Sequence, residues 1–130
     1  MKCLADSCVW IDFSQGKNTK EVIYFEEMLK NKLLYTVGLV KAEIIPFIKD
    51  TKIQNKVEDL FDVVSYLFDY VNVWNEVILH QKKLLKKGLV GSVPDLLLAS
   101  FSIHYNVPLL TTDHYFFSIA KIIELEVISL

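Results

Sequence analysis

Three aspartates in this sequence lie at or beside stretches of apolar residues. Asp6 follows the apolar residues CLA, and Asp113 follows the segment PLLTT. Asp95 is the fifth residue of GSVPDLLLASF, immediately before an almost wholly apolar run. An ionised carboxylate held in such surroundings needs compensation, because burying an unpaired charge is unfavourable. A divalent cation shared by the acids would supply that compensation.

Glu43 is a fourth acid of the same kind. Its helical neighbours three and four residues away are all apolar, namely Leu39, Val40, Pro46 and Phe47. We therefore expect the Glu43 carboxylate to project from an inward-facing helical surface without a local cation. Carboxylate oxygens, with no Cys or His at metal-binding spacing, favour a hard ion such as Mg²⁺ or Mn²⁺ over zinc.

Each of these acids also has a purely structural explanation. Asp95 could be a capping-box residue of the helix that it begins, and Asp113 could be the N-cap of the next helix. Asp6 could close a turn, and Glu43 could be neutralised by a distant lysine. Asp12 lacks the strand-end position of Asp6 and is interpreted as a surface or supporting acid.

Short apolar runs alternate with amphipathic stretches along the chain, a pattern that predicts a parallel α/β sheet covered by helices on both faces. The expected strands are residues 2–5, 33–36, 71–74, 107–111 and 125–130. The expected helices are residues 18–32, 38–49, 53–68, 76–87 and 92–105, of which the second and third form a helical hairpin over 38–68. No linker, repeat or low-complexity segment divides the chain, so residues 1–130 are expected to form a single domain.

The ends of the expected strands are the first places to look for a ligand site, because ligands of such sheets bind beyond the carboxyl ends of the strands. Asp6 ends the first expected strand, and Asp113 follows the fourth. Thr111 could orient a carboxylate or a bound water, although a threonine at the end of a strand is also common.

The charge balance gives no sign of a nucleic-acid binder at the level of the whole chain. The 130 residues include 16 acidic and 14 basic residues, for a formal net charge of −2. Any site for a polyanion must therefore be local. All 14 basic residues are lysines, and the densest group is Lys82, Lys83, Lys86 and Lys87. These four could contact an RNA backbone, or they could complement the C-terminus of a helix.

The remaining residue types indicate a soluble cytoplasmic protein that does not contact a membrane. Cys3 and Cys8 have no second cysteine pair with which to form a zinc site or a disulfide framework, which favours a reducing compartment. No signal-peptide pattern opens the sequence, and no apolar run approaches the roughly 20 residues of a membrane span.

The histidines and large aromatic residues are assigned to roles other than the site. The three scattered histidines, His80, His104 and His114, are expected at the surface or half-buried, and not as metal ligands. Trp10, Trp74 and the aromatic run around Phe116 are assigned to the core, and not to a platform on which bases stack.

Several stretches of the sequence resemble the PIN-domain nucleases, in particular the VapC-type toxins of toxin–antitoxin pairs. The stretches are LADSCVWIDF, VKAEIIPF, VPDLLLASFSIHYNVPLLTTDHYF and LEVISL, so the resemblance runs nearly end to end. That family places an acid after the first strand, a glutamate in the helix after the second, an aspartate at a helix start and a last aspartate in a T-x-D element. The matching residues here are Asp6, Glu43, Asp95 and Asp113, with Thr111 as the threonine.

Two features depart from the family pattern. Cys8 stands where the family usually has a serine, threonine or asparagine, and a thiol is a weaker hydrogen-bonding group than a hydroxyl. The chain also lacks the arginine that members often place near the third acid. Cys8 is nevertheless expected to support Asp6, together with Thr111.

The resemblance implies a single PIN-like domain that is a Mg²⁺- or Mn²⁺-dependent endoribonuclease. The four acids would hold the metal, and a metal-activated water would cleave RNA to leave a 5′-phosphate and a 3′-hydroxyl. It also implies a homodimer that is inhibited by a small antitoxin protein, whose tail wraps the helical hairpin. Two alternatives stay open. One is a weak or inert PIN-fold binding or regulatory module, and the other is a phospho-acceptor domain, which would need an aspartate where Asn75 follows VNVW.

Overall fold

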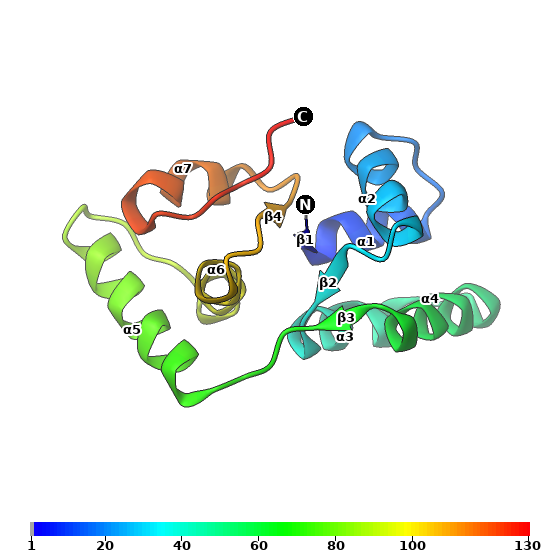
Figure 1. The fold of residues 1–130 in the computed structure, drawn as a ribbon, viewed down its shortest axis with the longest axis horizontal. Helices are drawn as coiled ribbons and strands as arrows, with labels where there is room; N and C mark the ends of the chain where they lie inside the picture. Colours follow the sequence, from blue (N-terminus) through cyan, green and yellow to red (C-terminus); the bar gives the residue numbers. More distant parts are fainter. Residues whose placement is uncertain (1) are drawn as a thin grey trace.

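A parallel sheet of four short strands forms the centre of the fold. The computed structural model describes residues 2–130. The strands are β1 (Cys3–Ala5), β2 (Leu34–Thr36), β3 (Ser65–Tyr66) and β4 (Leu109–Leu110). They are paired in the order β3-β2-β1-β4, and all three pairings are parallel (Figure 1). The predicted α/β class with a parallel sheet is confirmed.

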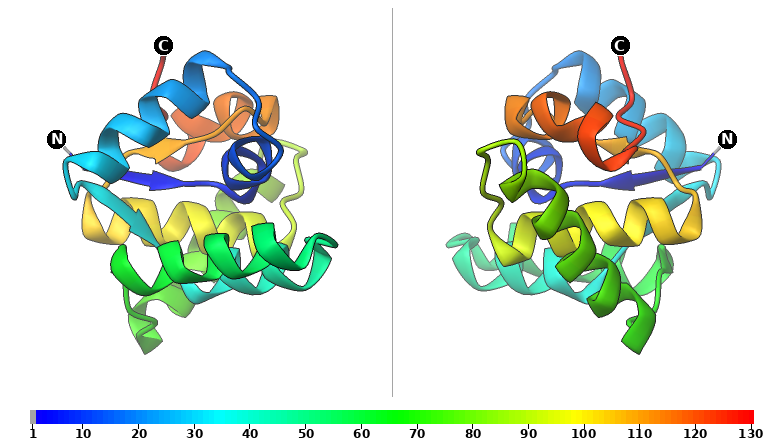
Figure 2. Two further views of the ribbon diagram at one scale, coloured as in Figure 1. Left: turned by 90° about the vertical axis from the view of Figure 1, so that its right-hand side faces the viewer. Right: turned by 90° about the vertical axis from the view of Figure 1, so that its left-hand side faces the viewer.

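Helices cover both faces of this sheet. Within residues 2–130 they are α1 (Ser7–Ser14), α2 (Lys20–Lys30), α3 (Gly38–Ile44), α4 (Thr51–Val63), α5 (Val71–Leu85), α6 (Val93–Tyr105) and α7 (His114–Ile123). A 3-10 turn, η1 (Ile45–Phe47), joins α3 to α4. Helices α1 to α4 lie on one side of the sheet, and α5 and α6 lie on the other (Figure 1). In both side views β1 runs through the middle of the molecule (Figure 2).

The strand order reverses between β1 and β4, and this brings the carboxyl ends of two strands together. The chain moves from β1 to β2 and β3 in one direction and then returns to place β4 on the other side of β1. The backbone N–H of Asp6 donates to the carbonyl of Leu110 at 2.9 Å. Residues that follow β1 and β4 therefore meet at one edge of the sheet, where ligands bind in open α/β folds.

Helix α6 is the most deeply packed element. Ser92 caps its N-terminus by accepting a hydrogen bond from the Asp95 N–H at 3.2 Å, and Asn106 ends it in the left-handed conformation at φ 54°. Every residue from Leu96 to Ser102 is buried, because the helix lies between the sheet and α5. The start of α6 is consequently held in a fixed position relative to β1.

The aromatic residues of the other helical layer form a packed group. The Trp10 ring stacks on Phe61 with centroids 4.0 Å apart and meets Phe25 edge-on at 4.8 Å. Trp10 and Phe116 are buried, as predicted, but the assignment of the aromatic run around Phe116 to the core is wrong for Phe117, which is 44% exposed. The assignment of Trp74 to the core is wrong, because its side chain is 41% exposed on α5.

The strand predicted at residues 71–74 is wrong. This segment is the first turn of α5, whose buried residues are Val73, Val77, His80 and Leu84. Their spacing of four, three and four residues is the period of a helix, and it begins inside the β-branched segment VNVW. Valine favours strands locally. The helical period of the buried residues over the whole of α5 outweighs this preference.

Two predicted helices end earlier than expected. The helix predicted at 38–49 ends at Ile44, because Pro46 has no N–H for a helical hydrogen bond and the chain continues as η1. The helix predicted at 53–68 ends at Val63, and β3 follows it. In place of a further helical turn, the Leu67 N–H donates to the Thr36 carbonyl of β2 at 2.9 Å.

The predicted strand at 125–130 is reduced to a single bridge between Leu109 and Val127. Conversely, α1 is a helix that the sequence pattern does not predict, because its apolar run CVWI has no clear helical period. No helix in residues 2–130 is both long and apolar enough to cross a membrane.

Candidate active site

Asp6 accepts more hydrogen bonds than the other acids of the predicted site. It directly follows β1, caps α1 and is only 7% exposed. Its Oδ1 accepts a hydrogen bond from the Ser7 N–H at 2.7 Å. Its Oδ2 accepts one from the Thr111 hydroxyl at 2.7 Å and a longer one from the Cys8 thiol at 3.4 Å. Both carboxylate oxygens are therefore fixed by groups from α1 and from the segment after β4.

Thr111 joins two of the predicted acids. Its hydroxyl donates to Asp6, and the same oxygen accepts the Asp113 N–H at 3.0 Å. Asp113 in turn accepts the Tyr115 N–H at 3.0 Å and caps α7. The T-x-D element thus positions the start of α7 beside Asp6.

Cys8 adds a weak contact to the same carboxylate. Its sulfur lies 3.5 Å from the Thr111 hydroxyl and accepts the Thr112 N–H at 3.5 Å. Burial, and then the charge of Asp6, raise the pKa of the Cys8 thiol. The thiol consequently stays protonated at neutral pH, and in this form it can donate to Asp6.

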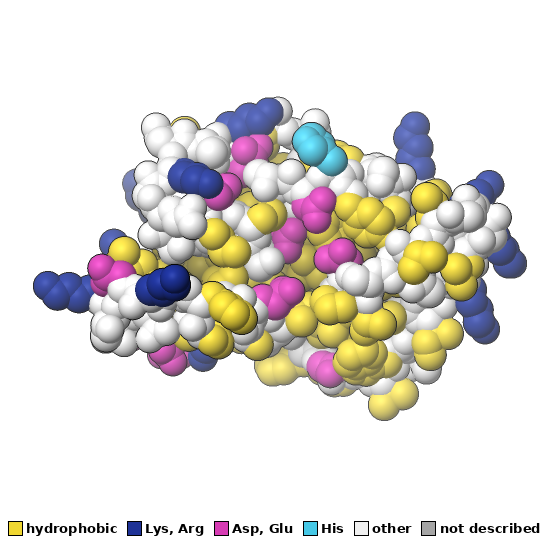
Figure 3. Space-filling model, turned by 180° about the vertical axis from the view of Figure 1, so that it is seen from behind, with side chains coloured by type: hydrophobic (Ala, Val, Ile, Leu, Met, Phe, Trp, Pro, Cys, Tyr) yellow, Lys and Arg dark blue, Asp and Glu magenta, His cyan; other side chains and the backbone are white. Residues whose placement is uncertain are grey.

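Glu43 and Asp95 face Asp6 from two other elements, α3 and α6. Burial, followed by the charges of Asp6 and Asp95, raises the pKa of Glu43. Burial also raises the pKa of Asp95, with further contributions from Asp6 and Asp113, while a hydrogen bond with Ser92 lowers it. These mutual effects mean that the four acids share one region. Acidic side chains gather in the middle of one face of the molecule, with hydrophobic side chains around them (Figure 3).

Glu43 is less buried than the sequence analysis predicts. The expected inward-facing surface exists for Val40 and Ile44, which are buried. The side chain of Glu43 is exposed, and Phe47 is 76% exposed. The prediction assumed that Pro46 and Phe47 lie on the same side of one helix as Glu43. Helix α3 ends at Ile44, so these two residues belong to η1 and do not cover Glu43.

Helix capping accounts for part of the role of three of the acids, although Asp6 caps a helix and does not close a turn as suggested. Asp6 and Asp113 cap helices, and Asp95 is the third residue of a helix whose N-cap is Ser92. Capping uses part of each carboxylate but does not neutralise its charge. The ion pairs found in residues 2–130 are Lys17 with Asp12 and His104 with Glu76, and neither includes any of the four acids.

The four acids offer only carboxylate oxygens, the ligands that a hard divalent cation prefers, and each acid interacts through its charge with at least one of the others. As the side chains stand in residues 2–130, no three acidic, histidine or cysteine residues are close enough to hold one ion. Closing around a cation therefore requires a rotamer change. Glu43 is suited to this change, because its side chain is exposed and its carboxylate is not held by a hydrogen bond in the described part of the chain.

His104 and His114 are exposed, as predicted, but the expectation that His80 is at the surface or half-buried is wrong. His80 is buried between α5 and α6, where its Nδ1 lies 2.9 Å from the Ser100 hydroxyl. Burial lowers the pKa of His80, so it is neutral at physiological pH. His104 pairs with Glu76 on the surface.

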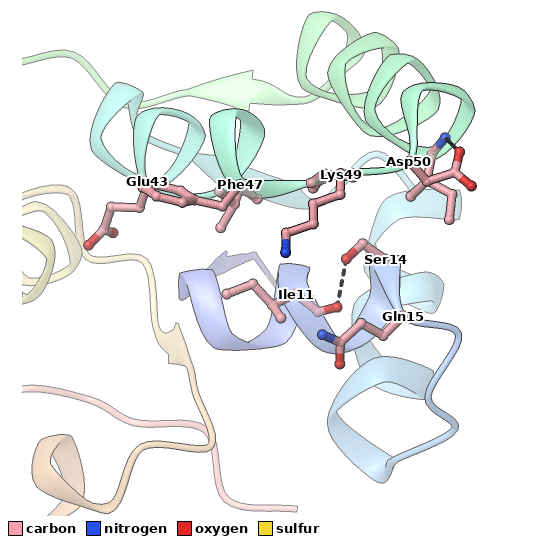
Figure 4. A pocket seen from close by; sticks show the side chains of 10 residues that line it. Ile11, Ser14, Gln15, Glu43, Phe47, Lys49 and Asp50 are labelled. Atoms are coloured by element: carbon pink, nitrogen blue, oxygen red, sulfur yellow. Dashed lines mark hydrogen bonds between the residues drawn. The ribbon is translucent and has the colours of Figure 1, made fainter.

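A pocket beside Glu43 was missed by the sequence analysis. It has a volume of about 420 Å³, and its lining residues come from α1, the end of α3, η1 and the start of α4. Glu43 lies at one end and points away from Lys49 and Asp50, which lie toward the other (Figure 4). Its apolar walls include Ile11 and Phe47, and only the break at Pro46 marks this exposed segment in the sequence.

Tyr115 is a second residue at the site that was not predicted. Its hydroxyl donates to the Val90 carbonyl at 3.1 Å. Burial and then the charges of Asp95 and Asp113 raise its pKa, which places its ring beside both acids. Tyr115 thereby ties the segment before α6 to the start of α7.

The predicted lysine cluster lies apart from the acids. Lys83, Lys86 and Lys87 line a second pocket of about 430 Å³ together with Lys121 and Ile122 of α7. Lys82 belongs to the last turn of α5 but does not line this pocket. Lysine side chains occupy the rim of the face on which the acids gather (Figure 3).

The Thr111 hydroxyl can be tested by Thr111→Val. The substitution removes the donor to Asp6 and leaves the Asp113 N–H without its acceptor. We expect the free energy of unfolding to fall by about 1–3 kcal/mol, the cost of leaving buried polar groups unpaired. Thr111→Ser keeps the hydroxyl, so its free energy of unfolding should fall much less than that of Thr111→Val. Urea unfolding of both variants checks this, and a loss for Thr111→Ser as large as that for Thr111→Val would contradict the role of the hydroxyl, because serine keeps it.

The fold matches that of three solved structures. VapBC2 from Rickettsia felis, bound to a DNA fragment from their promoter, has a TM-score of 0.80 at 19% identity, over 100% of this chain and 99% of that chain. VapBC-1 from nontypeable Haemophilus influenzae has a TM-score of 0.75 at 20% identity, over 99% and 98%. FitAcB from Neisseria gonorrhoeae has a TM-score of 0.73 at 13% identity, over 98% and 96%. At these identities the likeness shows a shared fold.

No curated protein compared with the sequence matches it. The family model of the PIN domain, in contrast, matches residues 3–122. This range begins in β1, ends in α7 and includes all four acids and Thr111. PIN domains are generally nucleases, and they generally use divalent metal ions. The chain therefore belongs to the PIN domain family.

Proposed function

We propose that this chain is a metal-dependent endoribonuclease, the toxin of a toxin–antitoxin pair, and that it hydrolyses RNA phosphodiester bonds at the acid cluster. One observation carries the proposal. Carboxylates from four elements face one region at the carboxyl ends of β1 and β4, and none of them belongs to an ion pair in residues 2–130. Such uncompensated charge opposes folding, so a role in binding a cation explains it better than scaffolding does.

In this proposal each residue has a definite task. Asp6, Glu43, Asp95 and Asp113 hold Mg²⁺ or Mn²⁺. A bound ion of this kind lowers the pKa of water and offsets charge on the phosphate. Thr111 and Cys8 are positioning residues, because they act through the Asp6 carboxylate.

The alternative is a PIN-fold binding or regulatory module with weak or no activity. The observation in its favour is the contact made by Cys8. A thiol 3.4 Å from Asp6 holds the carboxylate less firmly than the hydroxyl of Thr111 at 2.7 Å. In this alternative, however, the cluster of four acids has no function.

RNA cleavage in the presence and absence of metal decides between the two. With Mg²⁺ or Mn²⁺ the purified protein should cut labelled RNA and leave 5′-phosphate ends. The activity should stop in excess EDTA and return when Mg²⁺ is added back. Cleavage that persists in EDTA would contradict the metal-dependent mechanism, and a complete lack of cleavage with both ions would favour the inert module.

The proposed antitoxin partner fits the helical segment 38–63. The pocket beside Glu43 opens there, and its apolar rim includes Ile11, Phe47 and Ile53, all of which are exposed. A partner segment seated in this pocket would cover apolar surface and would reach the site at Glu43. The similar structures from Rickettsia felis and Haemophilus influenzae are described as VapBC, and this is consistent with such a partner.

The proposed homodimer is supported by apolar side chains exposed on α5. Val71, Trp74 and Ile78 are 77%, 41% and 56% exposed, and their spacing places them along one side of the helix. We expect light scattering to give the mass of two 15.0 kDa chains. Val71→Lys with Ile78→Lys should shift the protein toward the monomer, whereas Ile23→Lys on α2 should not. A monomer mass for the wild type at high concentration would contradict the dimer.

A further inference from the structure

One side of α7 connects the acid cluster to the lysine-lined pocket, which we call the basic pocket (Lys83, Lys86, Lys87 and Lys121). The buried residues of α7 are Phe116, Ile119 and Ile123. Its exposed residues at helical spacing are His114, Phe117, Ser118 and Lys121. Because residues three and four apart share one side of a helix, these exposed residues form a continuous surface along α7.

The two ends of this surface carry opposite charge. Asp113, a proposed metal-holding acid, caps the N-terminus of α7. Lys121 lies in the last turn and lines the basic pocket. Lys121 lies eight positions after Asp113, which corresponds to roughly 12 Å at 1.5 Å per residue. A ligand several units long can therefore contact both ends at once.

The basic pocket has the composition of a site for phosphate groups. Its lysines come from the end of α5, from the turn that follows it and from α7, and no acidic residue lines it. None of the four lysines takes part in the ion pairs found in residues 2–130. Converging positive charges without a counter-ion repel one another, and a polyanion that binds there relieves the repulsion and releases its own counter-ions.

Phe117 lies between the acids and the basic pocket. Its side chain is 44% exposed, in contrast to the neighbouring Phe116, which is buried. The His114 ring lies beside it, with centroids 6.5 Å apart. An exposed aromatic ring next to lysines is the arrangement by which proteins stack the bases of single-stranded nucleic acids.

We propose that the exposed side of α7 is the path of a single RNA strand, with a base stacked on Phe117 and the backbone phosphates held by the basic pocket. This inference rests on the proposed function and adds to it the form of the substrate. A base can stack on Phe117 only when it is unpaired, so the strand on α7 is single. The path also explains how RNA approaches a cluster of acids, because the lysines at its other end offset the repulsion.

The experiment measures RNA binding in EDTA, where the proposed cleavage does not interfere. The probe is a short single-stranded RNA that contains 2-aminopurine, whose fluorescence falls when the base stacks. The slope of log affinity against log salt concentration is negative. Lys121→Ala should make this slope shallower by about 0.7, and the double variant Lys83→Ala with Lys87→Ala should make it shallower by about 1.4. Lys56→Ala on α4 is the matched control, and it should leave the slope unchanged.

The aromatic contact is tested by two variants of similar size. Phe117→Leu should weaken binding by about 5-fold to 150-fold and should restore 2-aminopurine fluorescence, because leucine has no π face. Phe117→Tyr should behave like the wild type. A duplex of the same sequence should bind more weakly than the single strand and should not respond to Phe117→Leu.

The outcomes separate this inference from the proposed function. If the wild type binds and cleaves RNA, but Lys121→Ala and Phe117→Leu bind as the wild type does, the path along α7 is wrong and the nuclease proposal stands. Equal losses for Lys121→Ala and Lys56→Ala would also overturn the path. If the wild type neither binds nor cleaves single-stranded RNA, both proposals fail.

Discussion

Asp6→Asn should reduce metal-dependent RNA cleavage by at least about 100-fold, because a metal ion contributes several kcal/mol to the transition state of such reactions. Asparagine has the size of aspartate but no charge. Its amide can accept from Thr111 or from the Ser7 N–H but not from both, since one of its two polar atoms is a donor. The fold should persist, while the cation loses the acid that is held most firmly.

The measurement is the single-turnover cleavage rate at saturating Mg²⁺, with circular dichroism as a check of the fold. Asp12→Asn is the matched control, because Asp12 lies on α1 and pairs with Lys17 on the surface. Loss of a surface ion pair changes stability by less than about 1 kcal/mol, so this variant should cleave RNA at nearly the wild-type rate. A rate for Asp6→Asn close to that of Asp12→Asn would mean that Asp6 does not hold the ion.

The second large effect concerns stability and does not need the substrate. Mg²⁺ at about 100 times its dissociation constant should stabilise the wild type by about 2.7 kcal/mol. Mg²⁺ should stabilise Glu43→Gln and Asp95→Asn less than the wild type, because each variant has lost one proposed metal ligand. In EDTA both variants should be at least as stable as the wild type, since removing one charge relieves both the cost of burial and the repulsion by the other acids, which raise the pKa of Glu43 and Asp95.

Asp50→Ala is the control for a purely structural acid. Asp50 caps α4 by accepting from the N–H groups of Lys52 and Ile53. Its removal should cost about 0.5–2 kcal/mol in EDTA and leave the response to Mg²⁺ unchanged. Thermal melts could instead show that Glu43→Gln and Asp95→Asn lose stability in EDTA and respond to Mg²⁺ as strongly as the wild type, as expected for Asp50→Ala. This result would mean that Glu43 and Asp95 have only a structural role and do not form the metal site.

The pH dependence of the same comparison has a definite sign. A carboxyl group with a raised pKa in the folded protein binds a proton more tightly there than in the unfolded chain. Its contribution to stability is therefore present below the unfolded pKa, near 4, and is lost as the pH rises through the folded pKa. The advantage of Glu43→Gln and Asp95→Asn over the wild type in EDTA should shrink as the pH falls from 7 to 4, as urea unfolding can show.

The fold class and the meeting of Asp6 with Asp113 were predictable because both depend on local features of the sequence. Asp6 and Asp113 follow short apolar runs, and parallel strands bring such positions together at one edge of a sheet. The strand at 71–74 was mispredicted because its valines favour a strand, whereas burial against α6 extends over four helical turns. The exposure of Glu43 depends on where α3 ends, and tertiary packing determines this.

The residues that the sequence could not reveal are those defined by contacts between distant elements. Lys121 joins the basic pocket only because α5 and α7 lie side by side. Phe117 and Phe116 are adjacent and chemically identical, and only the orientation of α7 decides that one is buried and the other exposed. Tyr115 contacts Val90 across 25 residues of sequence.

The difference in packing between α6 and α3 has a consequence for motion within the site. Asp95 projects from the first turn of a helix in which every residue from Leu96 to Ser102 is buried, so that moving its backbone requires breaking much of the packing around α6. Glu43 projects from a seven-residue helix that gives way to η1 at Pro46. Local opening therefore starts on the Glu43 side and needs little free energy there. The acids are therefore bordered by one rigid helix, α6, and by one helix that opens more easily, α3.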